Sequence, residues 1–207
     1  MARLRILAVT AFWASLACLG TEGQVYGQDR TEWFHPNQQV RVANLPSLVA
    51  PSGDPSAVLV TALATALHDP AVCCGKDSAL EDTAFSEPRS LKELGAKSQG
   101  RHRLSDGLPI IVDAEYVPAS SITAAIIVGV LQDQHAPLIE WQSHFYVLYG
   151  AVFNEAGNSS GERQYIIVKL LLLDPRFSGR RREVVFDNEA DDPRTLQGML
   201  KVAVARR

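Results

Sequence analysis

The stretch HFYVLYGAVFNEAGNSSGERQYIIVKLLLLD, which spans residues 144–174, decides the fold. Two runs rich in β-branched and aromatic residues, 144–153 and 165–173, flank a loop of Gly, Asn and Ser. This composition is typical of two strands joined by a turn. Strands joined by a short turn pair side by side. We therefore predict an antiparallel hairpin in which Tyr146 and Leu172 lie in neighbouring strands.

Further strands are expected on both sides of this hairpin. Short apolar runs occupy residues 108–114 and 136–141 before it, and residues 184–186 after it. Runs of this length, bounded by turn residues, indicate strands rather than helices. Because the later runs are consecutive and the turns between them are short, the last third of the chain is predicted to form an antiparallel sheet.

Helix signals gather ahead of this sheet. Residues 54–55, an Asp followed by a Pro, are typical of an N-cap and first turn, and the Asp-Pro pair at 69–70 ends that helix. Ser90 and Glu93 form a capping box for a second helix. Two serines at 120–121 precede a third. Helices followed by a sheet indicate the α+β class.

The first residues are typical of a secretory signal. Arg3 and Arg5 precede an apolar run at 6–19, which is shorter than the roughly 20 residues of a membrane-spanning helix. Cleavage is expected after Gly20 or Gly27, and we favour the later site. The protein is therefore expected to be exported, either to the periplasm or out of the cell.

Three segments follow from these signals. Residues 1–27 are predicted to be the signal peptide, residues 28–53 an extended N-terminal arm, and residues 54–207 the folded domain. Whether Cys18 carries a lipid stays open. The formal net charge is −3 with both signs interspersed, so no basic face for nucleic acid is expected. No later apolar run is long enough to span a membrane, and the oligomeric state is not indicated.

Two adjacent cysteines, Cys73 and Cys74, follow the signal. Neighbours bridge poorly, so both can be buried hydrophobes or one can be reactive. Cys74 stands where a short helix is predicted to begin, and a helix N-terminus and a nearby imidazole both favour the thiolate. His144 begins a core strand. Asp174 ends the next strand of the hairpin, so it is expected beside His144 and in position to orient the imidazole.

Other charged groups indicate no cofactor. Arginines at 176–182 and an acidic patch at 187–192 are expected to pair with each other, and the patch lacks the loop spacing of a calcium site. The cysteines and histidines lack the spacing of a zinc site. Phosphate loops and dinucleotide fingerprints are missing. We therefore expect neither a metal nor an organic cofactor.

The order of these features resembles the papain-like cysteine peptidases, and most of all their bacterial C39-like branch. The resemblance rests on the Cys-Gly step at 74–75, on the strand of the form His-x-x-Val-x-x-Gly that begins at His144, and on the Asp-Pro pair at 174–175. It covers roughly residues 67–176. The family has a glutamine six residues before the nucleophile, as an oxyanion donor, and His68 stands there in this chain.

The resemblance implies a papain-like α+β fold with N-terminal helices packed on a C-terminal antiparallel sheet, and a thiol hydrolase that acts on a peptide or protein substrate. Cys74 would attack the carbonyl, His144 would transfer the proton, and Asp174 would orient His144. His68 and the Cys74 backbone N–H would stabilise the oxyanion. Two alternatives stay open: a non-catalytic exported binding protein on the same fold, and a thiol-redox protein that uses Cys73 and Cys74.

Overall fold

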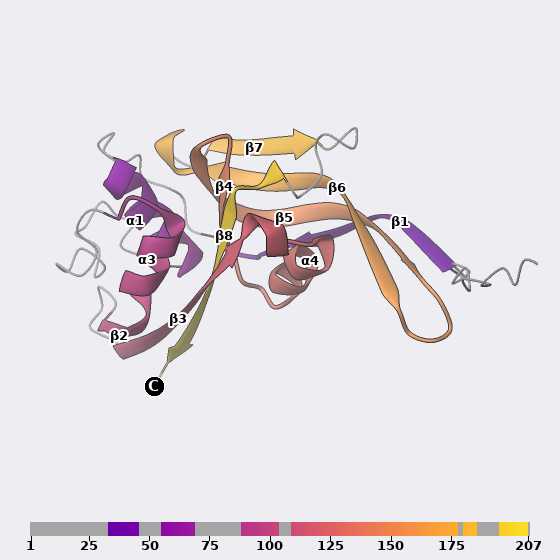
Figure 1. Cartoon of the computed structure of the whole chain (residues 1–207), viewed down its shortest axis with the longest axis horizontal. Coiled ribbons are helices and arrows are strands. Elements are labelled where there is room, and N and C mark those ends of the chain that lie inside the picture. Colours follow the sequence, from indigo (N-terminus) through magenta and orange to yellow (C-terminus); the bar gives the residue numbers. More distant parts are fainter. Residues whose placement is uncertain are drawn as a thin grey trace, which may run out of the picture. The chain divides into compact units, whose positions relative to one another are not determined.

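A computed structural model describes residues 33–45, 55–68, 88–103, 109–177, 180–185 and 195–206. Most of these residues belong to one antiparallel sheet. The strands are β1 (Trp33–Arg41), β2 (Gly100–Arg103), β3 (Pro109–Pro118), β4 (Leu138–Trp141), β5 (His144–Gly157), β6 (Arg163–Asp174), β7 (Arg180–Val185) and β8 (Gly198–Arg206). Their order is β2-β3-β8-β4-β5-β6-β7, and β1 also pairs with β5 (Figure 1).

The predicted hairpin is confirmed. β5 and β6 pair antiparallel with Leu148 opposite Leu172, so Tyr146 and Leu172 do lie in neighbouring strands. Both strands extend beyond the predicted runs, because the turn needs only residues 158–162. In this turn the Asn158 side chain accepts a hydrogen bond from the backbone N–H of Glu162 at 3.1 Å.

The segment predicted as an extended arm contributes a strand to the same sheet. β4 pairs with β5 only as far as Val147, and β1 pairs with the rest of β5, at residues 150–157. In this way β5 has hydrogen-bonded neighbours on both sides along most of its length. The register of β1 shifts around Pro36, which has no backbone N–H to donate to a ladder.

The predicted papain-like α+β fold, with N-terminal helices packed on a C-terminal sheet, is wrong. β1 precedes every helix that the structure describes, and helix α4 (Ala124–Gln132) lies between β3 and β4 in the chain. β8, which no sequence prediction covered, pairs with both β3 and β4. It does so because its alternate residues Leu200 and Val202 are buried in the core. The described chain is mainly an antiparallel sheet with helices between its strands.

Of two helices whose first residues were predicted, one begins at the predicted residue and the other begins later. Helix α1 (Pro55–Ala66) begins at Pro55, as predicted. Helix α4 begins later than predicted, because the cap is Thr123, whose hydroxyl accepts a hydrogen bond from the backbone N–H of Ile126 at 3.3 Å. The predicted cap residues form a separate helical turn, η3 (Ala119–Ser121).

Helix α3 (Leu91–Ser98) provides a test of the capping prediction. The Ser90 hydroxyl accepts from the backbone N–H of Glu93 at 3.2 Å, and the Glu93 carboxylate accepts from the backbone N–H of Arg89 at 3.0 Å. We expect Ser90→Ala to lower the free energy of unfolding by about 1 kcal/mol in urea denaturation. Ser121→Ala, at an exposed position without a capping bond, is the control. Equal losses in the two variants would contradict the cap.

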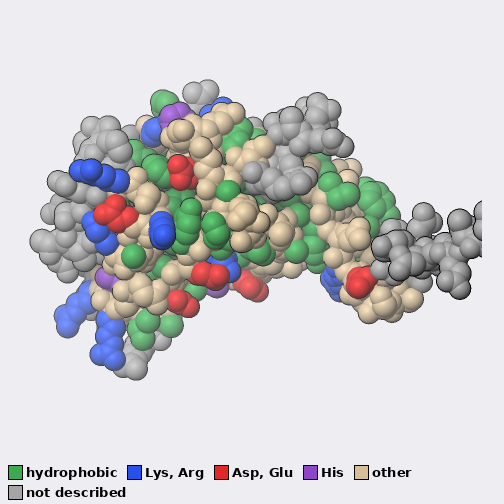
Figure 2. Space-filling model, viewed as in Figure 1, with side chains coloured by type: hydrophobic (Ala, Val, Ile, Leu, Met, Phe, Trp, Pro, Cys, Tyr) green, Lys and Arg blue, Asp and Glu red, His purple; other side chains and the backbone are tan. Residues whose placement is uncertain are grey.

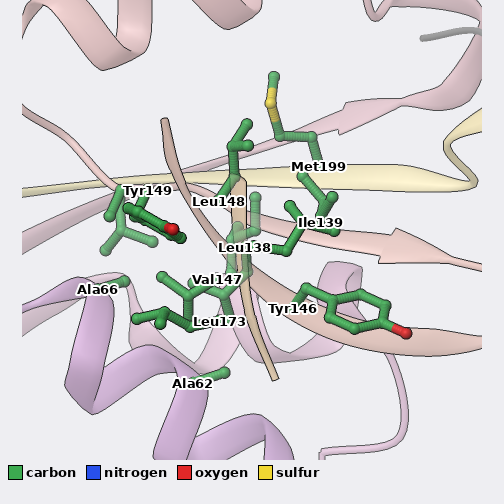
Figure 3. Close-up of a cluster of buried hydrophobic side chains, with 14 of the residues drawn as sticks. Ala62, Ala66, Leu138, Ile139, Tyr146, Val147, Leu148, Tyr149, Leu173 and Met199 are labelled. Carbon is green, nitrogen blue, oxygen red and sulfur yellow. The ribbon is translucent and has the colours of Figure 1, made fainter. Parts of the chain in front are cut away.

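The core lies between the sheet and its helices. Figure 3 shows Ala62 and Ala66 of α1 beside Val147 and Leu173, whereas Leu148 points to the opposite face of the sheet. This alternation is the ordinary one along a strand. The ring of Tyr146 is fully buried at the edge of this core, with its hydroxyl pointing away from the cluster (Figure 3). The polar contacts of that hydroxyl lead to the candidate site.

Candidate functional site

The predicted nucleophile falls outside the residues that the structure describes. Cys73 and Cys74 both lie outside the described residues, so the assignment of Cys74 as the nucleophile stays a prediction. The predicted oxyanion donor His68 is described, and it follows α1 with a left-handed φ of 57°. Desolvation and the charge of His135 lower the pKa of His68. His68 lies in the turn that follows α1.

His144 and Asp174 lie on the same face of the sheet. Val147 of β5 is opposite Leu173 of β6, so the next position along this register places Tyr146 opposite Asp174. His144 is two residues beyond Tyr146 and shares its face. The His144 side chain is exposed, and it makes no hydrogen bond or ion pair with any other described residue. Tyr146, rather than His144, is the β5 residue across from Asp174.

Asp174 binds Arg176. The side chain of Asp174 is buried, and the carboxylate accepts from Arg176 Nε at 2.9 Å, from Nη2 at 2.6 Å and from the backbone N–H at 3.1 Å. Burial raises the pKa of Asp174, but these hydrogen bonds and the charges of Arg176 and Arg182 outweigh it, and the pKa is lowered. The carboxylate is therefore ionised, with both oxygens engaged.

The local sequence explains this geometry. Pro175 follows Asp174 directly, and a proline has no N–H with which to continue the ladder of β6. The chain turns instead through η4 (Pro175–Phe177). This turn brings the Arg176 side chain back over the end of β6, where the guanidinium can meet the carboxylate with two parallel hydrogen bonds. The Asp-Pro pair thus positions an ion pair within the turn.

Aromatic rings surround the two arginines. Arg176 Cζ lies 5.9 Å from the ring centroid of Tyr146 and 5.4 Å from that of Phe177. Arg182 Cζ lies 5.5 Å from the ring centroid of Trp141 and 6.0 Å from that of Tyr146. At these distances the rings attract the cations. We name this set the arginine–aromatic cluster; its members are Trp141, Tyr146, Asp174, Arg176, Phe177 and Arg182.

The buried hydroxyl of Tyr146 links the cluster to β7. Arg182 Nη1 donates to that hydroxyl at 3.1 Å. β7 pairs with β6 so that Arg182 is opposite Leu172, which puts Arg182 on the face that carries Asp174. Figure 2 shows basic and histidine side chains together on the part of the surface where β7 lies in Figure 1. The cluster thus joins β4, β5, β6 and β7.

The arginine–aromatic cluster is not predicted from the sequence. The predicted partner of the arginines is the acidic patch at 187–192, which lies beyond the described ranges, so that pairing stays a prediction. One signal was available: once residues 180–185 are taken as a strand beside β6, alternation places Arg182 on one face and Arg181 on the other. The bond between Arg176 and Asp174 had no comparable signal, because it depends on the turn geometry of η4.

Two further observations concern the described residues alone. They contain no group of three or more His, Cys, Asp or Glu side chains arranged to hold a metal ion. None of the helices among them has the length and apolar character needed to cross a membrane.

Comparison with protein-family models, with curated proteins and with solved structures identifies no match. No relative therefore supplies a function, and the contacts of the chain itself have to suggest one.

Proposed function

We propose that this protein is an exported, non-catalytic binding protein. The observation that carries the proposal is the bond between Asp174 and Arg176. In a Cys-His-Asp arrangement the carboxylate accepts a hydrogen bond from the imidazole and so orients it. Both oxygens of Asp174 serve Arg176 instead, in the bidentate geometry of a strong charge-assisted pair. The carboxylate that the predicted site requires thus already accepts three hydrogen bonds from Arg176.

The exposure of His144 also favours a non-catalytic role. A catalytic imidazole has to be held in one orientation to exchange a proton with a thiol. The His144 side chain is exposed and has no hydrogen-bond partner within the described ranges. No hydrogen bond among those residues holds the ring of His144 in one orientation.

Helix α1, one of the helices that pack on β5, provides a third argument. α1 contacts both β5 and η4, and its sequence, PSAVLVTALATA, contains no cysteine. The field of a helix dipole acts on groups within the first turn. Among the described residues α1 therefore supplies no activated thiol to the strand that His144 begins, and the segment that contains Cys73 and Cys74 lies outside those residues. The two cysteines come later in the chain.

A thiol hydrolase is the second candidate. One observation favours it: His144 and Asp174 lie on the same face of neighbouring strands. For Asp174 to orient His144, however, the exposed imidazole would have to turn toward a buried carboxylate that already accepts three hydrogen bonds from Arg176. The binding role requires no such rearrangement, and we favour it for this reason.

Thiol alkylation distinguishes the two candidates. At about pH 6 an ordinary thiol with a pKa of about 8.5 is almost fully protonated and reacts slowly, whereas an imidazole-paired thiolate reacts fast. We expect iodoacetamide to label Cys73 and Cys74 slowly and at similar rates, with no change in His144→Ala. Peptide mapping of Cys73→Ser and Cys74→Ser variants assigns the label.

The control for this experiment is His35→Ala, which removes another exposed imidazole. Fast labelling of Cys74 that His144→Ala abolishes and His35→Ala preserves would contradict the binding proposal. Such a result would establish a reactive Cys-His pair and support the hydrolase.

A further inference from the structure

We propose that the arginine–aromatic cluster binds the carboxylate of an acidic peptide segment, with Arg182 as the main recognition residue. This inference rests on the proposed binding function, for which it names the site and the class of ligand.

The charges of the cluster do not cancel. Asp174 offsets Arg176, with which it forms an ion pair at 2.6 Å. Arg182 has the neutral hydroxyl of Tyr146 as its hydrogen-bond partner within the described residues. Its side chain is exposed, and a guanidinium carries five N–H donors. Within the described residues Arg182 therefore forms no ion pair, and most of its donors are available to a ligand.

The guanidinium of Arg182 is already held in place. It lies over the rings of Trp141 and Tyr146, and these two rings are themselves in contact, with centroids 6.1 Å apart. Tyr146 is fixed by its complete burial. A ligand therefore does not have to immobilise a free arginine side chain, a cost that normally reduces affinity. The planar fork of a guanidinium matches the two oxygens of a carboxylate.

The surroundings of Arg182 favour a peptide over a small inorganic anion. Phe177 is 55% exposed, and its ring lies against Arg176 at the edge of the cluster. Trp141, whose ring lies against Arg182, is partly exposed. An apolar side chain that follows or precedes an acidic residue can cover these rings while the carboxylate meets Arg182. A sulfate or phosphate group alone would leave the apolar surface uncovered.

Arg181 provides a matched control within the same strand. It is exposed, as Arg182 is, and its Cζ lies 5.7 Å from the ring centroid of Tyr149. Neighbouring residues of a strand point to opposite faces, so Arg181 is outside the cluster. Replacing either arginine removes one charge; Arg181 loses its contact with one aromatic ring, and Arg182 loses its contacts with two. If Arg182→Ala and Arg181→Ala differ in peptide affinity, the difference therefore shows which face of the sheet binds the peptide, because both variants have the same net charge.

The test is fluorescence anisotropy with the full mature chain and a labelled peptide that contains Glu-Phe-Glu. The same peptide with Gln in place of Glu is the ligand control. We expect saturable binding of the acidic peptide alone, a loss of affinity of about tenfold or more in Arg182→Ala, and less than about twofold in Arg181→Ala, because only Arg182→Ala removes the charge-assisted pair with the peptide. Arg182→Gln, which keeps a donor for Tyr146, serves if Arg182→Ala does not fold.

Three outcomes would overturn the proposal. They are an absence of binding to the acidic peptide, equal losses in Arg181→Ala and Arg182→Ala, and binding of heparin through Arg182 without binding of the peptide, which would indicate a sulfated glycan. Each is distinct from a failure of the proposed function, which shows as fast alkylation of Cys74. If Cys74 is alkylated slowly and the acidic peptide does not bind, the peptide site at the arginine–aromatic cluster is wrong but the proposed binding function is not contradicted.

Discussion

Arg176→Ala is expected to lower the free energy of unfolding by about 3 kcal/mol at neutral pH, because it leaves the buried carboxylate of Asp174 without its partner. The side chain of Asp174 is 4% exposed and that of Arg176 is 29% exposed. The control is Arg163→Ala, which removes an arginine from the pair with Glu155, where the Arg163 side chain is 61% exposed. An exposed pair of this kind contributes little to stability, because water screens the two charges. Urea denaturation measures both.

The effect of Arg176→Ala depends on pH in a defined direction. The pKa of Asp174 is lowered in the folded protein. Its contribution to stability is therefore present above the unfolded pKa of about 3.9 and is lost as the pH falls through the lower folded value. In Arg176→Ala burial dominates and raises the pKa of Asp174, so that the variant loses stability as the pH rises through that value. The difference between the two proteins should therefore grow from acidic to neutral pH, and a constant difference would contradict the role of Asp174.

Gly150→Ala is expected to lower the free energy of unfolding by about 2 kcal/mol, because the added methyl group has no room. A Cβ atom at Gly150 would lie 2.8 Å from the backbone oxygen of Val40 and 3.0 Å from Leu171 Cδ1. β1 has little freedom to move away, since the N–H of Val42 donates to the carbonyl of Tyr149 at 2.8 Å. The substitution should therefore disturb the pairing of β1 with β5.

The matched control is Gly129→Ala in α4. A Cβ atom at Gly129 meets no other atom within 4 Å, and alanine favours the helix over glycine by about 1 kcal/mol. This variant should therefore become more stable in the same denaturation experiment. If Gly150→Ala lost no stability relative to Gly129→Ala, the close contact between β1 and β5 would be wrong.

Local signals predicted the parts of the fold that depend on neighbours in the chain. The β5–β6 hairpin and the Ser90 cap are of this kind, because a short turn and a capping hydroxyl act over a few residues. β1 gave no such signal, since the side chains of residues 34–39 are exposed and its apolar residues do not alternate with polar ones. It forms a strand because its backbone pairs with residues 150–157 of β5, which β4 does not reach. Such a pairing depends on residues more than 100 positions away in the chain.

The candidate site shows the same division. The sequence placed Asp174 at the end of one strand and His144 at the start of its neighbour, and the structure agrees on both positions. It did not predict which group Asp174 binds, because that depends on how Arg176 turns back through η4. The order of motifs that resembles papain-like peptidases does not encode the position of β8 between β3 and β4. Motifs that occur in the same order as in papain-like peptidases therefore did not predict the order of the strands in this sheet.

The most direct test of the central claim is a carbon-13 NMR titration of the Asp174 carboxyl group in the unmodified protein, in His144→Ala and in Arg176→Ala. If Asp174 serves Arg176, its pKa is below the ordinary aspartate value in the unmodified protein, is unchanged in His144→Ala and rises in Arg176→Ala. A pKa of Asp174 that shifts in His144→Ala and stays the same in Arg176→Ala would show that Asp174 serves the imidazole, and would contradict the account.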